Sequence, residues 1–81
     1  MAWFVYRYPF PISQPTSYIL IPNNGKPACK EGEYLGAIKA EVLPDTYPAQ
    51  PDLSDEDFLR RMKKAIRLRK STGKIRLRPT P

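Results

Sequence analysis

The clearest pattern of apolar and polar positions lies in residues 53–70. At about 100° per residue, the apolar side chains of this segment fall on one stripe of a helix, made of Phe58, Leu59, Met62, Ala65 and Ile66. Positively charged side chains fall on the opposite side. The pattern therefore predicts an amphipathic helix whose narrow apolar face covers another element.

Three signals indicate where this helix begins. Ser54 is the expected N-cap, because its hydroxyl can accept a hydrogen bond from a backbone N–H of the first turn. Asp57 lies three positions later, as in a looser form of the capping box. Leu53 and Phe58 occupy the two positions of a hydrophobic staple around that cap. The first turn is therefore expected at residues 55–58.

The end of the helix is expected near Leu68 or Arg69, because a longer helix would turn Arg69 back into the apolar stripe. Ser71, Thr72 and Gly73 follow as a stop signal. In that signal Gly73 is the residue expected to adopt a positive φ.

Three other segments predict strands. Residues 3–8 are aromatic and β-branched without alternation, which indicates a strand buried on both faces or held by a partner. Residues 17–21 predict a second strand, followed by a turn at residues 23–25. Residues 74–78 alternate strictly between apolar and basic side chains, which is typical of an edge strand protected by charge.

Residues 33–43 leave two interpretations open. Every second residue, beginning with Tyr34 and continuing through Gly36, is apolar or small, which predicts a strand with one apolar face. The Ala, Lys, Glu and Leu content also suits a helix, but Gly36 and the loop before it favour the strand. The order strand–strand–strand–helix–strand predicts an α+β fold, a small antiparallel or mixed sheet with one amphipathic helix packed across it. We expect one small domain over residues 1–81, with a Pro-rich connector at residues 44–53.

Charge divides the chain into two unequal parts. Residues 1–57 carry four basic and eight acidic side chains, whereas residues 58–81 carry ten basic side chains and no acid. The net charge of +6 therefore combines an acidic part and a strongly basic one. Such asymmetry either serves an anionic partner or forms a solvated helix face that balances the protein's own acids. The side chains expected to contact an anionic partner are Arg60, Lys63, Lys64, Arg67, Lys70, Lys74, Arg76 and Arg78.

Few residues favour catalysis. The chain has no His and one cysteine, Cys29, so the common general base and an internal disulfide are both excluded. Lys26 and Lys30 would lower the pKa of a nearby thiol, but a structural or incidental role for Cys29 is favoured. We expect no enzyme activity, no cofactor, no metal and no small-molecule substrate. The longest apolar run, residues 2–6, is too short for a membrane span or a signal peptide, so the cytoplasm is the expected location.

The spacing of several positions along the chain carries a resemblance. These positions are Trp3, Tyr6, residues 15–18, Pro27, Cys29, Gly32, residues 35–40, the Pro-rich stretch, Ala65, Arg76 and Leu77. Together they resemble a family of short uncharacterised bacterial proteins of Bacteroidetes type. Members of that family carry a second cysteine where this chain has Gly36, and most carry an export signal that is absent here. The family has no known activity, so the resemblance implies no function.

Two binding functions agree with these features. The first is a non-enzymatic accessory or structural subunit of a larger assembly, which docks through its basic C-terminal part and an aromatic N-terminal strand containing Trp3, Phe4, Tyr6 and Tyr8. The same aromatic side chains would equally well fill the domain's own core. The second is sequence-nonspecific binding of nucleic-acid phosphates by the basic part. Anionic lipid is a third partner class, opposed by the narrow apolar face of the helix. We rank the assembly subunit first.

Overall fold

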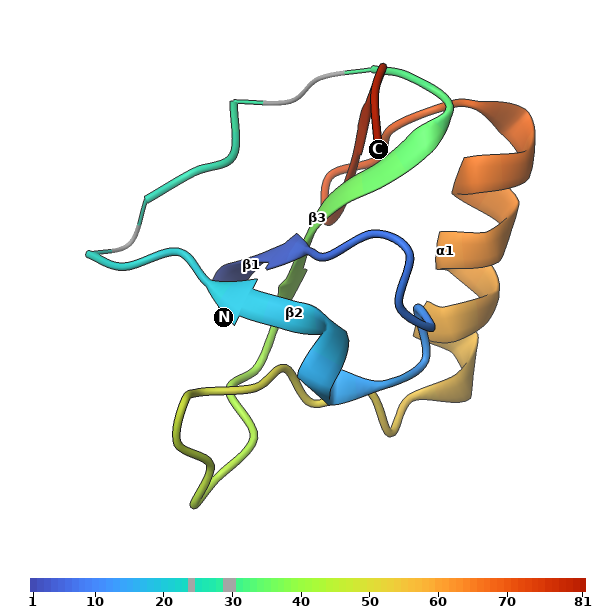
Figure 1. Ribbon diagram of the computed structural model, residues 1–81. Coiled ribbons are helices and arrows are strands. Elements are labelled where there is room, and N and C mark those ends of the chain that lie inside the picture. The colour runs from blue at the N-terminus through green and yellow to red at the C-terminus, as the bar shows by residue number, and fades with distance from the viewer. Residues whose placement is uncertain (24, 29–30) are drawn as a thin grey trace.

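The computed structural model describes residues 1–23, 25–28 and 31–81. Its elements are β1 (Ala2–Tyr6), the 3-10 turn η1 (Pro15–Ser17), β2 (Tyr18–Leu20), β3 (Tyr34–Ala40), α1 (Glu56–Leu68) and β4 (Ile75–Arg78). The four strands form one sheet in the order β2-β1-β3-β4, and all neighbouring strands are antiparallel. The helix packs along one face of this sheet (Figure 1). The predicted α+β fold is therefore confirmed, with an antiparallel sheet.

The core lies between α1 and the sheet. Phe4 of β1, Ile38 of β3 and Met62 of α1 are completely buried there. The central position of β1 explains why its sequence does not alternate, because Trp3 on the opposite face of the sheet is buried as well. The guanidinium of Arg76 lies 5.8 Å from the centre of the Trp3 ring and covers that face.

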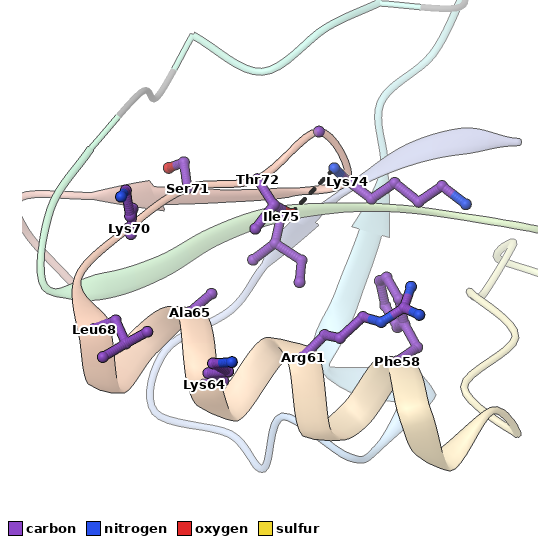
Figure 2. A pocket seen from close by; sticks show the side chains of 11 residues that line it. Phe58, Arg61, Lys64, Ala65, Leu68, Lys70, Ser71, Thr72, Lys74 and Ile75 are labelled. Carbon is purple, nitrogen blue, oxygen red and sulfur yellow. Dashed lines mark hydrogen bonds between the residues drawn. The ribbon is translucent and has the colours of Figure 1, made fainter.

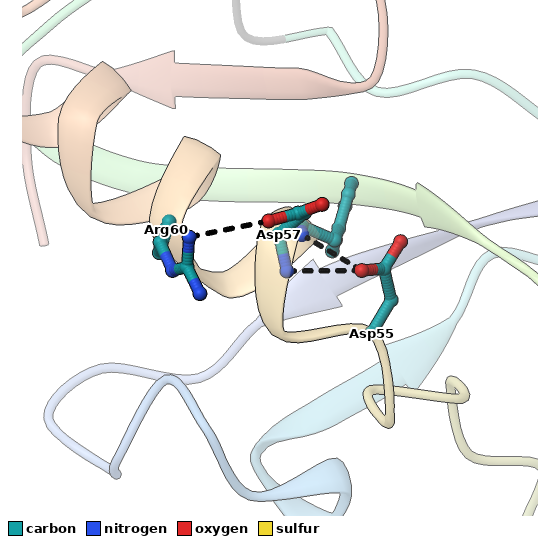
Figure 3. A network of polar contacts seen from close by, with 4 residues as sticks. Asp55, Asp57 and Arg60 are labelled. Carbon is teal, nitrogen blue, oxygen red and sulfur yellow. Dashed lines mark hydrogen bonds and ion pairs between the residues drawn. The ribbon is translucent and has the colours of Figure 1, made fainter.

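The helix begins one residue later than the sequence predicts. Its N-cap is Asp55, whose carboxylate accepts hydrogen bonds from the backbone N–H groups of Asp57 and Phe58 at 2.9 and 3.4 Å (Figure 3). The prediction of Ser54 as the cap is therefore wrong. The Ser54 N–H instead donates to the carboxylate of Asp52 at 3.0 Å. Hydrogen bonds from Ser54 hold the pKa of the Asp52 carboxyl below its ordinary value.

The helix ends at Leu68, as predicted, but the residue that takes the left-handed conformation is not the expected one. Arg69 takes the left-handed conformation, with φ of 53° and ψ of 44°. Its N–H donates to the Ile66 carbonyl, and the Lys70 N–H donates to the Ala65 carbonyl at 3.0 Å. These two bonds form a Schellman motif, in which glycine is the usual left-handed residue. Gly73 has no positive φ, so that prediction is wrong.

Residues 34–40 form the strand β3 and not a helix, as predicted, but the alternation of side chains between its two faces is interrupted. The register of β3 against β4 shifts between Leu35 and Ala37, which is a β-bulge containing Gly36. The bulge places Leu35 in the core together with Ile38. The strict alternation predicted from Tyr34 onward is therefore wrong at this point, because an extra residue in a strand puts the side chains before and after it out of step.

The connector between β3 and α1 folds back on itself rather than running extended. Val42 forms a β-bridge with Pro51, and the Leu43 N–H donates to the Gln50 carbonyl at 2.7 Å. Within this loop the Thr46 hydroxyl donates to the Leu43 carbonyl at 2.7 Å. The loop thereby returns the chain to the sheet before α1 begins.

The turn predicted at residues 23–25 is described in part. Asn24 lies outside the described residues, and the Gly25 N–H donates to the Pro22 carbonyl.

Candidate docking groove

A groove of about 650 Å³ lies between α1 and the segment that leads into β4 (Figure 2). Its floor is apolar and consists of Phe58, Ala65, Leu68 and Ile75. Basic side chains stand along it, Arg61 and Lys64 from the helix and Lys70 and Lys74 from the segment opposite. None of the described residues that line the groove is acidic. The groove thus combines an apolar floor with a positively charged rim.

The helix supplies its side of the groove by simple periodicity. Phe58, Arg61, Ala65 and Leu68 follow one another at intervals of three or four residues, so they share one stripe of α1. This stripe borders the fully buried stripe that contains Met62. The ten residue steps from Phe58 to Leu68 give the groove a length of about 15 Å, since a helix rises about 1.5 Å per residue.

Hydrogen bonds fix the opposite wall. The Schellman bond from Lys70 to the Ala65 carbonyl turns the chain immediately after α1. The Thr72 N–H then donates to the Ile75 carbonyl at 2.8 Å, and the Ser71 hydroxyl accepts from the Leu77 N–H at 3.0 Å. Ile75 points from this wall toward the helix, where it faces Ala65 (Figure 2). The wall is therefore held in place before any partner arrives.

Among the described residues, side-chain carboxylates form ion pairs with cations that lie outside the groove. Arg60 pairs with Asp57 at 3.4 Å, and Arg69 pairs with Glu33 at 3.2 Å. Both pairs are well exposed, where ion pairs contribute little to stability. In the part of the chain that the structure describes, the four rim cations form no ion pair. Arg61 and Lys74 nevertheless border a second pocket that Glu41, Asp52 and Asp55 also line, whereas Lys64 and Lys70 do not.

The structure brings three of the eight predicted cations together in this groove, namely Lys64, Lys70 and Lys74. The other five lie elsewhere. Lys63 and Arg67 are exposed on α1 outside the groove, Arg60 pairs with Asp57, Arg76 covers Trp3, and Arg78 is half-buried at the end of β4.

Arg61 is the groove residue that the predicted set omits. It lies three residues after Phe58 and four before Ala65, a spacing that places all three on one side of the helix. This spacing was the sequence signal that could have assigned Arg61 to the groove. The position lies at the border between the apolar and basic stripes, where periodicity alone separates the two groups poorly.

Three of the four aromatic residues predicted for a protein interface lie in the domain's own core. Trp3, Phe4 and Tyr6 have exposed fractions of 8%, 0% and 6%, because β1 is an inner strand with neighbours on both sides. Tyr8 is 52% exposed, and its ring lies edge-on to Tyr34 at 5.7 Å between centres. Of the four predicted residues, Tyr8 alone is therefore exposed, and the nearby Phe10 is 48% exposed.

Other kinds of site find little support in the described part of the chain. Cys29 lies outside the described residues. Within residues 1–23, 25–28 and 31–81, no group of three or more Cys, Asp or Glu side chains is placed to hold a metal ion. Among the same residues, no helix has the length and apolar character needed to cross a membrane.

Comparison of the chain with protein-family models, with curated proteins and with solved structures gives no significant match. The resemblance to short bacterial proteins stays a prediction.

Proposed function

We propose that this protein is a non-enzymatic accessory subunit of a macromolecular assembly, docked through its basic C-terminal part onto an acidic protein partner. The observation that carries this proposal is the groove beside α1, which has four cations on its rim and no acid among its described lining residues. Protein interfaces combine an apolar centre with a polar rim, and complementary charge on the two partners aligns them. The groove has both properties.

The apolar floor favours a protein over a nucleic acid. Phosphates are bound by cations, polar side chains and backbone N–H groups, and an aliphatic surface adds nothing to those contacts. Single-stranded nucleic acids also use exposed aromatic rings on which bases stack. Phe58 is the one aromatic residue of the groove, and it packs against the core. A protein partner supplies carboxylates and aliphatic side chains at once.

The cations outside the groove support the same function in another way. Lys63 and Arg67 are exposed on α1 and extend the positive surface beyond the rim. Such charges steer an acidic partner toward the surface and raise the association rate, with an effect that falls as salt increases. We expect them to contribute to the rate of docking more than to its lifetime.

Co-purification tests the proposal. The tagged full chain is isolated from the cells that make it, with and without nuclease, and the bound proteins are identified by mass spectrometry. We expect an acidic protein that stays bound after nuclease treatment, and that binds the purified chain at a fixed stoichiometry. Substitution of Lys64 and Lys74 by glutamate should weaken that reconstituted complex at least about tenfold.

Binding of labelled RNA and DNA at two salt concentrations covers the alternative. A nucleic-acid function predicts a fall of log affinity with log salt of about 0.9 per phosphate contacted on a duplex, and about 0.7 on a single strand. Micromolar binding of this kind, together with loss of all co-purifying proteins after nuclease, would replace the proposed function by nucleic-acid binding.

A further inference from the structure

We infer that the groove takes a short acidic amphipathic segment of the partner, with two or three aliphatic side chains inserted between flanking carboxylates. This inference rests on the proposed function and specifies its ligand. It concerns the chemistry of the segment that enters the groove, whereas the proposed function requires only that the partner surface be acidic.

The floor indicates where aliphatic side chains insert. Ala65 is the smallest side chain of the helix stripe, and it lies between the larger Phe58 and Leu68. Ile75 faces Ala65 from the opposite wall (Figure 2), and the two are almost completely buried, with exposed fractions of 1% and 4%. Leu68 has an exposed fraction of 56%, which leaves most of an aliphatic side chain in water at one end of the floor. An aliphatic group of the segment would therefore cover Leu68 and the exposed part of Phe58, beside this buried contact.

The rim indicates where the acidic groups of the segment lie. Arg61 and Lys64 stand on the helix side of the floor, whereas Lys70 and Lys74 stand on the other side. A segment in the groove therefore meets cations on both flanks of its aliphatic residues. Acidic residues interleaved with aliphatic ones match this arrangement, because each carboxylate can then reach a cation while its neighbour enters the floor.

The hydrogen-bonded wall makes the groove suitable for a short ligand. A short segment offers few contacts, so it binds well only where the site needs little rearrangement. The Thr72–Ile75 and Ser71–Leu77 hydrogen bonds hold the wall that carries Lys70 and Lys74. The groove is about 15 Å long, which accommodates about ten residues of helix or four to five residues of extended chain.

Fluorescence anisotropy with two labelled peptides tests the inference on the full chain. The first peptide consists of Glu-Glu-Leu-Leu repeats, about 12 residues long, which as a helix slightly exceeds the groove. The second replaces each leucine by serine and keeps the same charge. We expect the leucine peptide to bind at least about tenfold more tightly than the serine peptide, because only the former covers the floor.

Matched variants locate the site. Lys64→Glu with Lys74→Glu reverses two rim charges, whereas Lys63→Glu with Arg67→Glu makes the same change of net charge outside the groove. We expect the rim double variant to weaken the leucine peptide at least about tenfold and the outer double variant less than about threefold. Leu68→Ser should remove most of the preference for leucine over serine. All these side chains are exposed, and circular dichroism verifies that each variant is folded.

The outcomes separate the inference from the proposed function. If both peptides bind equally, and both double variants weaken them equally, the groove inference is overturned while docking onto an acidic protein stands. If neither peptide binds, and labelled RNA binds in a way that the rim double variant abolishes, both the inference and the proposed function are overturned. A leucine preference that is lost in Leu68→Ser and in the rim double variant supports both.

Discussion

Replacement of Met62 by alanine tests whether α1 packs on the sheet as described. The Met62 side chain is completely buried, and its sulfur lies 3.7 Å from the Tyr18 hydroxyl. The substitution removes three heavy atoms from the core, at about 0.8 kcal/mol each, and leaves a cavity that adds to the loss. The Tyr18 hydroxyl keeps its hydrogen bond to the Ile12 carbonyl at 2.6 Å, so no polar group loses its only partner. We expect a loss of about 3 kcal/mol in the free energy of unfolding.

That loss is large for a chain of 81 residues. Domains of this size have a free energy of unfolding of roughly 4–12 kcal/mol, so Met62→Ala should lower it by a quarter or more. A loss of 3 kcal/mol corresponds to a fall in Tm of roughly 12–24 °C.

Urea denaturation followed by circular dichroism measures the effect, with an unchanged slope as evidence that the folded state is otherwise intact. Leu68→Ala provides the control, because Leu68 is on the same helix but mostly exposed, and it should cost less than about 0.5 kcal/mol. Ile66→Ala should fall between the two, since Ile66 is half-buried against the core. A cost below about 1 kcal/mol for Met62→Ala, or a larger cost for Leu68→Ala, would mean that a different face of α1 contacts the sheet.

Three further predictions concern the helix start, two glycines and one tyrosine. Asp55→Ala should cost roughly 0.5–2 kcal/mol by removing the N-cap, whereas Ser54→Ala should change the melting temperature little. Gly32→Ala should strongly destabilise the fold, because Gly32 has a φ of 154° and an added Cβ would lie 2.0 Å from the backbone of β4; Gly73→Ala, with no atom within 4 Å, should be tolerated in the same melting experiment. Burial raises the pKa of Tyr18 above its ordinary value of 10.0, so the fold keeps this hydroxyl protonated while the unfolded chain loses the proton. Stability should therefore fall as the pH rises above 10.0, and the fall should be smaller in Tyr18→Phe when urea denaturation is repeated across that pH range.

Periodicity was enough to predict α1 and β4 and the core residues that these two elements supply. The apolar stripe of residues 58–66 and the alternation of residues 74–78 each depend on one local repeat, and both are confirmed by burial of Met62, Ile75 and Leu77. Such repeats are found where a helix or strand buries one face and exposes the other to water. The order of the elements then left few ways to cover the apolar faces, and the antiparallel sheet with one helix is one of them.

Details that depend on competition between similar groups could not be predicted. Ser54 and Asp55 are adjacent, and both residue types make good N-caps. The choice falls to Asp55 because Asp52 takes up the Ser54 N–H and fixes the approach of the chain. Likewise Arg69 takes the left-handed conformation at the helix end, although Gly73 is the residue with lower intrinsic cost.

The groove could not be predicted because it is formed by two segments whose relative position is tertiary. The sequence identified Lys64, Lys70 and Lys74 as cations, but it also grouped them with Arg76 and Arg78. The sheet separates these sets, since Arg76 covers Trp3 on the face turned away from α1. The Schellman turn after α1, together with the Thr72–Ile75 and Ser71–Leu77 hydrogen bonds, determines which cations meet across the apolar floor.

The arrangement of acids bears on whether the basic part is only a solvated face that balances the acidic part. The acids at the start of α1 are Asp55, Glu56 and Asp57, and the helix of 13 residues places its far end about 20 Å away. Charges in water are screened beyond about 8 Å at physiological salt, so these acids act little on Lys70. Arg61 and Lys74 lie nearer to acids, because both border a second pocket that Glu41, Asp52 and Asp55 also line. The acid at the other end, Glu33, pairs with Arg69, which does not line the groove. Arg61 and Lys74 therefore have acids nearby but no ion pair among the described residues, whereas Lys64 and Lys70 border no acid in either pocket. An acidic segment in the groove would add carboxylates beside Lys64 and Lys70, where the protein supplies none, while it covers the floor.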